Sequence, residues 1–132
     1  GDQAEEYCLC LLLKYPSLRE DGEKLAPDYF ERSENKEVFV EWTKTQLSDE
    51  ALADLEISLR EYVENLKARS LPPSDKNEQK KALADCMRRL EIRIVRAQYA
   101  IDAESAIDIG ADEEESSARL MEVQRQQTIL GW

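Results

Sequence analysis

The chain has 132 residues, 42% of them hydrophobic, which is the size of one domain and enough to bury a core. Its net charge of −11, from 29 acidic and 18 basic residues, opposes direct binding to the phosphate backbone of nucleic acids. Histidine is absent, which removes the commonest general base and most transition-metal sites. We therefore expect no catalytic residues, no metal ligands and no cofactor.

The sequence also lacks the usual features of membrane attachment and of disulfide bonding. No apolar run reaches the length of about eighteen residues that a spanning helix needs, and neither a signal peptide nor a lipidation motif is present. Cys8 and Cys10 lie two positions apart in a helical stretch and point to nearly opposite faces, so they cannot share a metal. We interpret these two and Cys86 as reduced core residues of a cytoplasmic protein.

The first predicted helix runs from Gln3 to Tyr15 and ends before Pro16. Apolar residues occur on all its sides, which predicts a helix buried over most of its circumference. We interpret the acidic residues of its first turn, Glu5 and Glu6, as partners of the helix dipole.

Two shorter helical segments follow in the sequence. Pro27 is placed to begin one helical turn, whose aromatic residues Tyr29 and Phe30 enter the bundle. Ser33 is the predicted N-cap of a helix that ends at Gln46. Helical spacing places three large apolar residues of that helix on a stripe that faces the core: Val38, Phe39 and Trp42.

Ser48 is the predicted N-cap of the next helix, which continues without interruption to about Arg69. Its apolar residues repeat every three or four positions: Leu52, Leu55, Leu59, Tyr62, Val63 and Leu66. Pro72 and Pro73 cannot continue this helix, because proline lacks the amide donor and disfavours helical backbone in the preceding residue. The diproline is therefore the clearest boundary in the chain.

A long helix is predicted from Lys76 to Ile109, where neither glycine nor proline occurs. Its apolar residues form a heptad seam of Leu83, Met87, Leu90, Ile94, Ala97 and Ile101, and a second stripe of Ile92, Val95 and Tyr99. At a rise of 1.5 Å per residue this helix is about 50 Å long, which is more than a bundle of this size needs. We expect part of it to project.

Gly110 is placed to end this helix, and Asp112 to begin a last one that folds back antiparallel. The predicted last helix continues to the terminus at helical spacing through Leu120, Val123, Gln127 and Leu130. The predicted fold is all-α, with an N-terminal helical bundle over residues 3–71. A long helix and a terminal antiparallel helical hairpin follow over residues 74–132.

Charge is distributed unevenly along the predicted long helix. Its first half is mainly basic through Lys76, Lys80, Lys81, Arg88, Arg89, Arg93 and Arg96, whereas every charged residue over 102–115 is acidic. This pattern is either an ordinary solvated face or a feature that steers a charged partner helix. Our candidates for partner binding are Arg93, Arg96, Tyr99, Ile107, Ile109, Ile129, Leu130 and Trp132. Packing within the hairpin explains Ile107 and Leu130 equally well.

Three segments of the chain, taken in order, resemble one protein family. They are EEYCLCLLLKYPSL over residues 5–18 with Phe30 after it, NKEVFVEW over 35–42, and LEIRIVRAQ over 90–98, which an acidic gap and a short last helix follow. Together they resemble the helicase-binding C-terminal domain of bacterial DNA primase (DnaG type) over nearly the whole chain. The cysteines of the first helix and Lys36, where arginine is expected, depart from that pattern.

The resemblance implies a domain that binds the N-terminal domain of the replicative DNA helicase, recruits primase for RNA primer synthesis and modulates the helicase. The resemblance associates the bundle with stimulation of the helicase and the hairpin with binding to it. The zinc-binding and polymerase modules of primase would lie upstream. We would expect a monomer or weak dimer with little or no direct nucleic-acid binding. Two alternatives remain, namely the N-terminal domain of the helicase itself and a coiled-coil homo-oligomerisation module.

Overall fold

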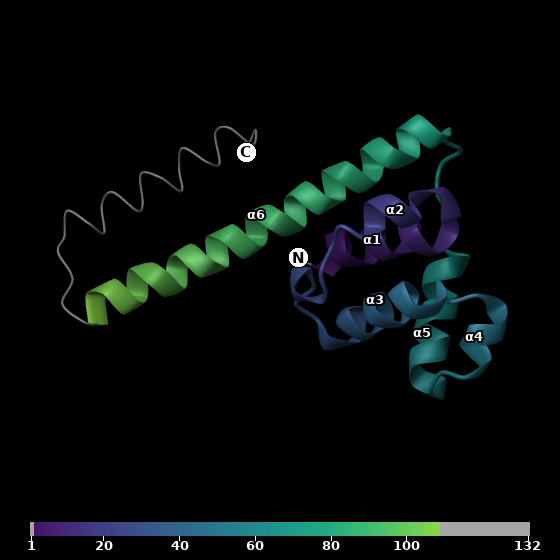
Figure 1. The fold of residues 1–132 in the computed structure, drawn as a ribbon, viewed down its shortest axis with the longest axis horizontal. Coiled ribbons are helices and arrows are strands. Elements are labelled where there is room, and N and C mark those ends of the chain that lie inside the picture. The colour runs from purple at the N-terminus through teal and green to yellow at the C-terminus, as the bar shows by residue number, and fades with distance from the viewer. Residues whose placement is uncertain (1, 109–132) are drawn as a thin grey trace. The chain divides into compact units, whose positions relative to one another are not determined.

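The computed structural model describes residues 2–108, and these form six α-helices and two short 3-10 helices, η1 and η2 (Figure 1). Their bounds are α1 Asp2–Lys14, η1 Pro16–Leu18, α2 Arg19–Gly22, η2 Pro27–Tyr29, α3 Ser33–Thr45, α4 Asp49–Ala53, α5 Ile57–Ala68 and α6 Lys76–Asp108. The all-α prediction is confirmed for these residues. The turn at Gly110 and the last helix, and with them the terminal hairpin, lie outside the described residues.

The chain divides into two compact units, Gly1–Leu90 and Glu91–Trp132, so the boundary falls within α6. The first unit contains α1 to α5 and the first half of α6. The predicted boundary at the diproline does separate α5 from α6. The first half of α6 nevertheless belongs to the core of the first unit, because Leu83, Cys86 and Leu90 are buried there.

α1 is the central helix of the first unit. Five consecutive residues, from Cys8 to Leu12, are each at most 2% exposed, which confirms the prediction that this helix is buried on most sides. It packs against α3 and α5, and the buried residues of the first half of α6 join the same core (Figure 1). A helix enclosed in this way needs apolar residues at successive positions, as its sequence has.

The three cysteines are free and buried, as predicted for core residues. The Cys10 thiol donates a hydrogen bond to the backbone oxygen of Leu66 at 3.2 Å. Burial raises the pKa of the Cys8 thiol far above its ordinary value and raises that of Cys86 to about 11. Both therefore stay protonated at neutral pH and are poor nucleophiles.

An aromatic cluster closes the core beside α3. The Phe39 ring lies 5.2 Å from that of Phe30 and 5.9 Å from that of Trp42, measured between ring centroids. The Arg19 guanidinium lies 5.6 Å above the Trp42 ring and also donates to the backbone oxygen of Thr43 at 3.1 Å. The predicted core stripe of α3 is thus confirmed, and α2 covers its outer end.

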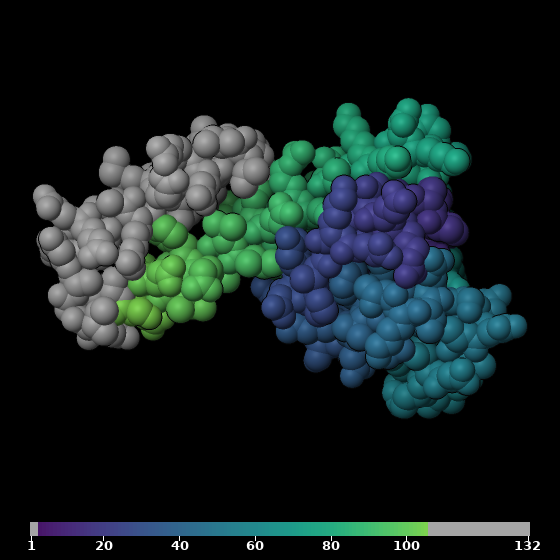
Figure 2. Space-filling view, viewed as in Figure 1, coloured from purple at the N-terminus to yellow at the C-terminus, as the bar shows by residue number. Residues whose placement is uncertain are grey.

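On the face shown in Figure 2, side chains of the first unit form a continuous surface.

Gly22 ends α2 where the helix approaches this cluster most closely. An added Cβ would lie 2.5 Å from Cδ2 of Leu12 and 2.6 Å from Cη2 of Trp42, and both of these side chains are 2% exposed. We expect Gly22→Ala to lower the free energy of unfolding by about 1–3 kcal/mol, because neither neighbour has space to move. Urea denaturation followed by circular dichroism measures this.

A double-mutant cycle supplies the control for that prediction. Leu12→Ala removes one of the two clashing side chains. The double variant should therefore lose less stability than the sum of the losses in the two single variants. Strict additivity, or an increase in stability on Gly22→Ala alone, would contradict close packing at this site.

α3 ends in a left-handed turn at Gln46 and Leu47, whose φ angles are 59° and 53°. Left-handed backbone is unfavourable for residues other than glycine, so other contacts must hold it. Leu47 is fully buried, and its backbone oxygen accepts a hydrogen bond from Nζ of Lys67 at 2.8 Å. The turn directs the chain into α4, where Oγ of Ser48 accepts from the backbone amide of Ala51 as predicted.

The prediction of one uninterrupted helix after Ser48 is wrong at residues 54–56. α4 ends at Ala53 with i to i+3 hydrogen bonds, from the amide of Asp54 to Ala51 and from that of Leu55 to Leu52. The backbone oxygen of Leu55 then accepts from Nη2 of Arg60 at 3.4 Å. Leu52 of α4 and Val63 of α5, on either side of the break, both lie in the core.

The predicted cap of α3 is also wrong, because Ser33 is the first helical residue and Arg32 occupies the cap position without a side-chain hydrogen bond. The carboxylate of Glu5, from α1, takes the place of a local cap. It accepts from the backbone amides of Glu31 at 3.0 Å and Arg32 at 3.4 Å. A side chain from a distant helix thus provides the hydrogen-bond acceptor for the backbone amides that precede α3.

Glu5 is the centre of a buried polar network that joins three helices. Its Oε1 accepts from Nδ2 of Asn35 on α3 at 2.9 Å, and Oδ1 of Asn35 accepts from the hydroxyl of Tyr62 on α5. Glu5 and Asn35 are both fully buried. The interpretation of Glu5 as a partner of the helix dipole therefore misses this network.

Candidate functional site

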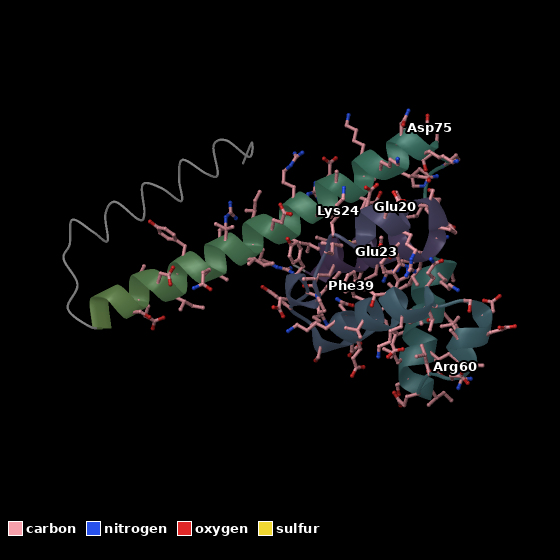
Figure 3. All side chains as sticks on the ribbon, in the orientation of Figure 1. Glu20, Glu23, Lys24, Phe39, Arg60 and Asp75 are labelled. Carbon is pink, nitrogen blue, oxygen red and sulfur yellow. The ribbon has the colours of Figure 1, made fainter. Side chains whose placement is uncertain are left out.

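The diproline segment leads into α6, and the start of α6 is fixed by a reciprocal cap. The backbone amide of Glu78 donates to Oδ1 of Asp75 at 2.8 Å, and the amide of Asp75 donates to Oε1 of Glu78 at 3.2 Å. This capping box satisfies two amides that a helix start otherwise leaves unpaired. Figure 3 labels Asp75 at this end of α6.

The first half of α6 has one buried face and one basic, exposed face. Leu83, Cys86 and Leu90 lie in the core of the first unit at 0–3% exposure, and Met87 is partly buried beside them. The basic side chains of this half are all exposed: Lys76, Lys80, Lys81, Arg88 and Arg89. Arg88 forms an ion pair with Asp85 at 3.9 Å. The exposed surface of this segment is therefore rich in basic residues.

The second half of α6, from Glu91 to Asp108, belongs to the second unit. Ile92 is buried and Ile94 is partly buried, but Val95 is 39% and Ile101 57% exposed. The heptad seam is therefore buried at its start and exposed towards its end. Ile101 belongs to the heptad seam and Val95 to the second stripe, so both apolar stripes of this half expose a β-branched side chain that a partner could cover.

The charge changes sign along the described part of α6. Basic residues predominate up to Arg96, whereas Asp102 and Glu104 are acidic and exposed. The Asp102 carboxylate accepts from Nε2 of Gln98 at 3.1 Å, one helical turn earlier. A helix of 33 residues with opposite charge at its two ends favours one orientation of a charged partner.

Four of the predicted partner-binding residues lie in this second half of α6, and three of them are at spacings of three positions: Arg93, Arg96 and Tyr99. Arg96 is exposed, the other two are partly buried, and each takes part in polar, ring or electrostatic interactions. Ile107 lies near the end of the same helix. The remaining candidates lie outside the described residues: Ile109, Ile129, Leu130 and Trp132.

Val95 and Ile101 were not among the predicted partner-binding residues, although both belong to the predicted apolar stripes. Periodicity assigns a residue to a stripe but does not say whether the stripe is covered. Because Val95 and Ile101 are aliphatic and exposed, they are better candidates for an apolar contact with a partner than Arg93, Arg96 or Tyr99.

Within residues 2–108, no group of three or more Cys, Asp or Glu side chains is arranged to hold a metal ion. Over the same residues, no helix has both the length and the apolar character needed to cross a membrane. None of the protein families, curated proteins or solved structures compared with this chain matches it.

Proposed function

We propose that this chain is a protein-interaction domain of a bacterial DNA primase that binds the N-terminal domain of the replicative DNA helicase. In this role it recruits primase to the replication fork for RNA primer synthesis and modulates the helicase. The chain itself contributes contacts and no catalytic residues. The observation that carries the proposal is the second half of α6, where Val95 and Ile101 are exposed on a helix of polarised charge.

Two further features support an interaction role. The resemblance of residues 5–18, 35–42 and 90–98 to the primase domain spans both compact units. The first unit supplies a rigid platform, because its core and its Glu5 network tie α1, α3 and α5 together. A rigid platform lowers the entropy lost when a partner binds to the surface.

Substitution of the two exposed α6 residues tests this proposal. Val95→Asp with Ile101→Asp should weaken binding to the helicase N-terminal domain at least about tenfold, because a charge would replace each apolar anchor. Titration calorimetry with the full chain measures the affinity, and co-migration in a sizing column shows the complex. Ile57→Asp is the matched control, since Ile57 on α5 is 61% exposed, close to the 57% of Ile101.

We expect the control to change the affinity by less than about twofold. A wild-type chain that does not bind the helicase domain would contradict the proposed function. An equal loss in the Ile57 control would contradict the assignment of binding to α6.

A second candidate function, a coiled-coil homo-oligomer, is favoured by one observation. Ile94 and Ile101 are one heptad apart on α6, and Ile101 is exposed. A second copy of α6 would cover such a seam. Sedimentation equilibrium separates the two functions, because this one requires a stable dimer that Ile101→Asp dissociates, whereas the first requires a monomer or weak dimer.

A further inference from the structure

The first unit has an open groove of about 720 Å³, lined by residues that the proposed function does not use. One wall is α3, the other is the break between α4 and α5, and Pro27 of η2 lies at the groove as well. Its volume is within the range of about 300–1,000 Å³ that is typical of ligand sites in proteins.

The floor of this groove is apolar. It is formed by the partly buried side chains of Val40, Leu55 and Leu59, two of which also pack against the core. Leu55 reaches the groove because the helix is interrupted at residues 54–56, and Arg60 holds the freed backbone oxygen of Leu55. The break in the helix therefore gives the groove one of its walls.

The rim of the groove is acidic. Glu37 and Glu41 lie on α3, Asp54 and Glu56 lie on the opposite wall, and Lys36 is the one basic residue among those that line it. Glu41 pairs with Lys44 at 3.6 Å. Glu37, Asp54 and Glu56 line the groove and are exposed, so their charges are accessible to a molecule that binds there.

An apolar floor between acidic rims selects its occupant by charge. Nucleic acids and other polyanions are repelled, and an acidic or neutral peptide gains nothing from the rim. A helical peptide with an apolar stripe flanked by lysine or arginine satisfies both parts of the groove at once.

We propose that the groove between α3 and the α4–α5 break binds a basic amphipathic segment of a partner protein. The surface is distinct from the second half of α6, and this inference does not depend on helicase binding.

The probe for this site is a fluorescein-labelled peptide of about four helical turns, with leucine at every third or fourth position and lysine between. Anisotropy titrations use the full chain at about 150 mM salt, where charges farther apart than about 8 Å are largely screened. A second peptide carries serine in place of each leucine and the same number of lysines. We expect the leucine peptide to bind at least about tenfold more tightly than the serine peptide.

Two charge variants complete the test. The groove variant combines Glu37→Gln, Asp54→Asn and Glu56→Gln, and should lose at least about tenfold in affinity for the leucine peptide. The control combines Glu20→Gln, Glu61→Gln and Glu64→Gln, which removes as many exposed carboxylates without altering the groove lining. Glu20, on α2, is far in Figure 3 from Arg60, which lies on α5 close to the break. This control should retain affinity to within about twofold.

Equal losses in both charge variants, or equal binding of the two peptides, would show nonspecific attraction to an acidic protein and overturn the proposal. A wild-type dimer that the groove variant dissociates in sedimentation equilibrium would also overturn it, because the groove would then hold a second copy. The Val95→Asp and Ile101→Asp variant should bind the leucine peptide normally. This readout separates a failure of the groove from a failure of the helicase-binding proposal.

Discussion

Replacement of Glu5 by alanine should lower the free energy of unfolding by about 3–5 kcal/mol, because three donors lose their shared acceptor and each unsatisfied buried donor costs about 1–3 kcal/mol. The Glu5 carboxylate accepts from two backbone amides before α3 and from Asn35, so its removal leaves these buried or partly buried donors without that acceptor. Urea denaturation at neutral pH, followed by far-ultraviolet circular dichroism, measures the loss.

Two variants define how this cost arises. Tyr62→Phe removes only the hydroxyl that donates to Asn35 at the far end of the network, and should cost about 1 kcal/mol. Glu20→Gln alters an exposed carboxylate of α2 and should change stability by less than about 0.5 kcal/mol. A loss on Glu5→Ala no larger than that of Tyr62→Phe would mean that the network does not hold α3 against α1.

Replacement of Phe39 by alanine should cost about 3–5 kcal/mol, because it opens a cavity in the middle of the aromatic cluster. Phe39 is 1% exposed, and its ring lies between those of Phe30 and Trp42, so neither neighbour can fill the space without losing its own contacts. Urea denaturation gives the change in stability, and near-ultraviolet circular dichroism reports the packing of the remaining aromatic rings.

Phe39→Leu is the matched variant, since it keeps most of the apolar volume and should cost clearly less than alanine. A cost below about 1 kcal/mol for Phe39→Ala would contradict the tight packing of this cluster. Because Phe39 lies on the side of α3 that faces the core, the groove should be affected only through global unfolding.

Local sequence signals predicted the positions of most helices. Proline marks the end of α1 and the linker before α6, because it lacks an amide donor and restricts its neighbour. Ser48 caps α4 through a bond to an amide three residues later. In each case the atoms that decide the structure lie within a few residues of one another, so the sequence contains the necessary information.

The errors in prediction come from contacts between distant residues. Glu5 accepts from the two amides that precede α3 and lie 26 and 27 positions away, which no local rule for Ser33 anticipates. The apolar period of residues 52–66 continues through the break at residues 54–56, and Leu52 and Val63 lie in one core on either side of it. A periodic pattern shows which residues share a face, whereas a kink depends on where the other helices lie.

The same distinction between local and long-range information applies to the candidate binding surfaces. Composition and periodicity alone determined an all-α protein, a long α6 with polarised charge and the absence of histidine chemistry. Only the tertiary structure decided that Val95 and Ile101 are exposed while Leu83 and Leu90 are buried, and that an acidic groove opens beside the α4–α5 break. The physical reason is that exposure belongs to the packed assembly, since it depends on which other segments cover a residue.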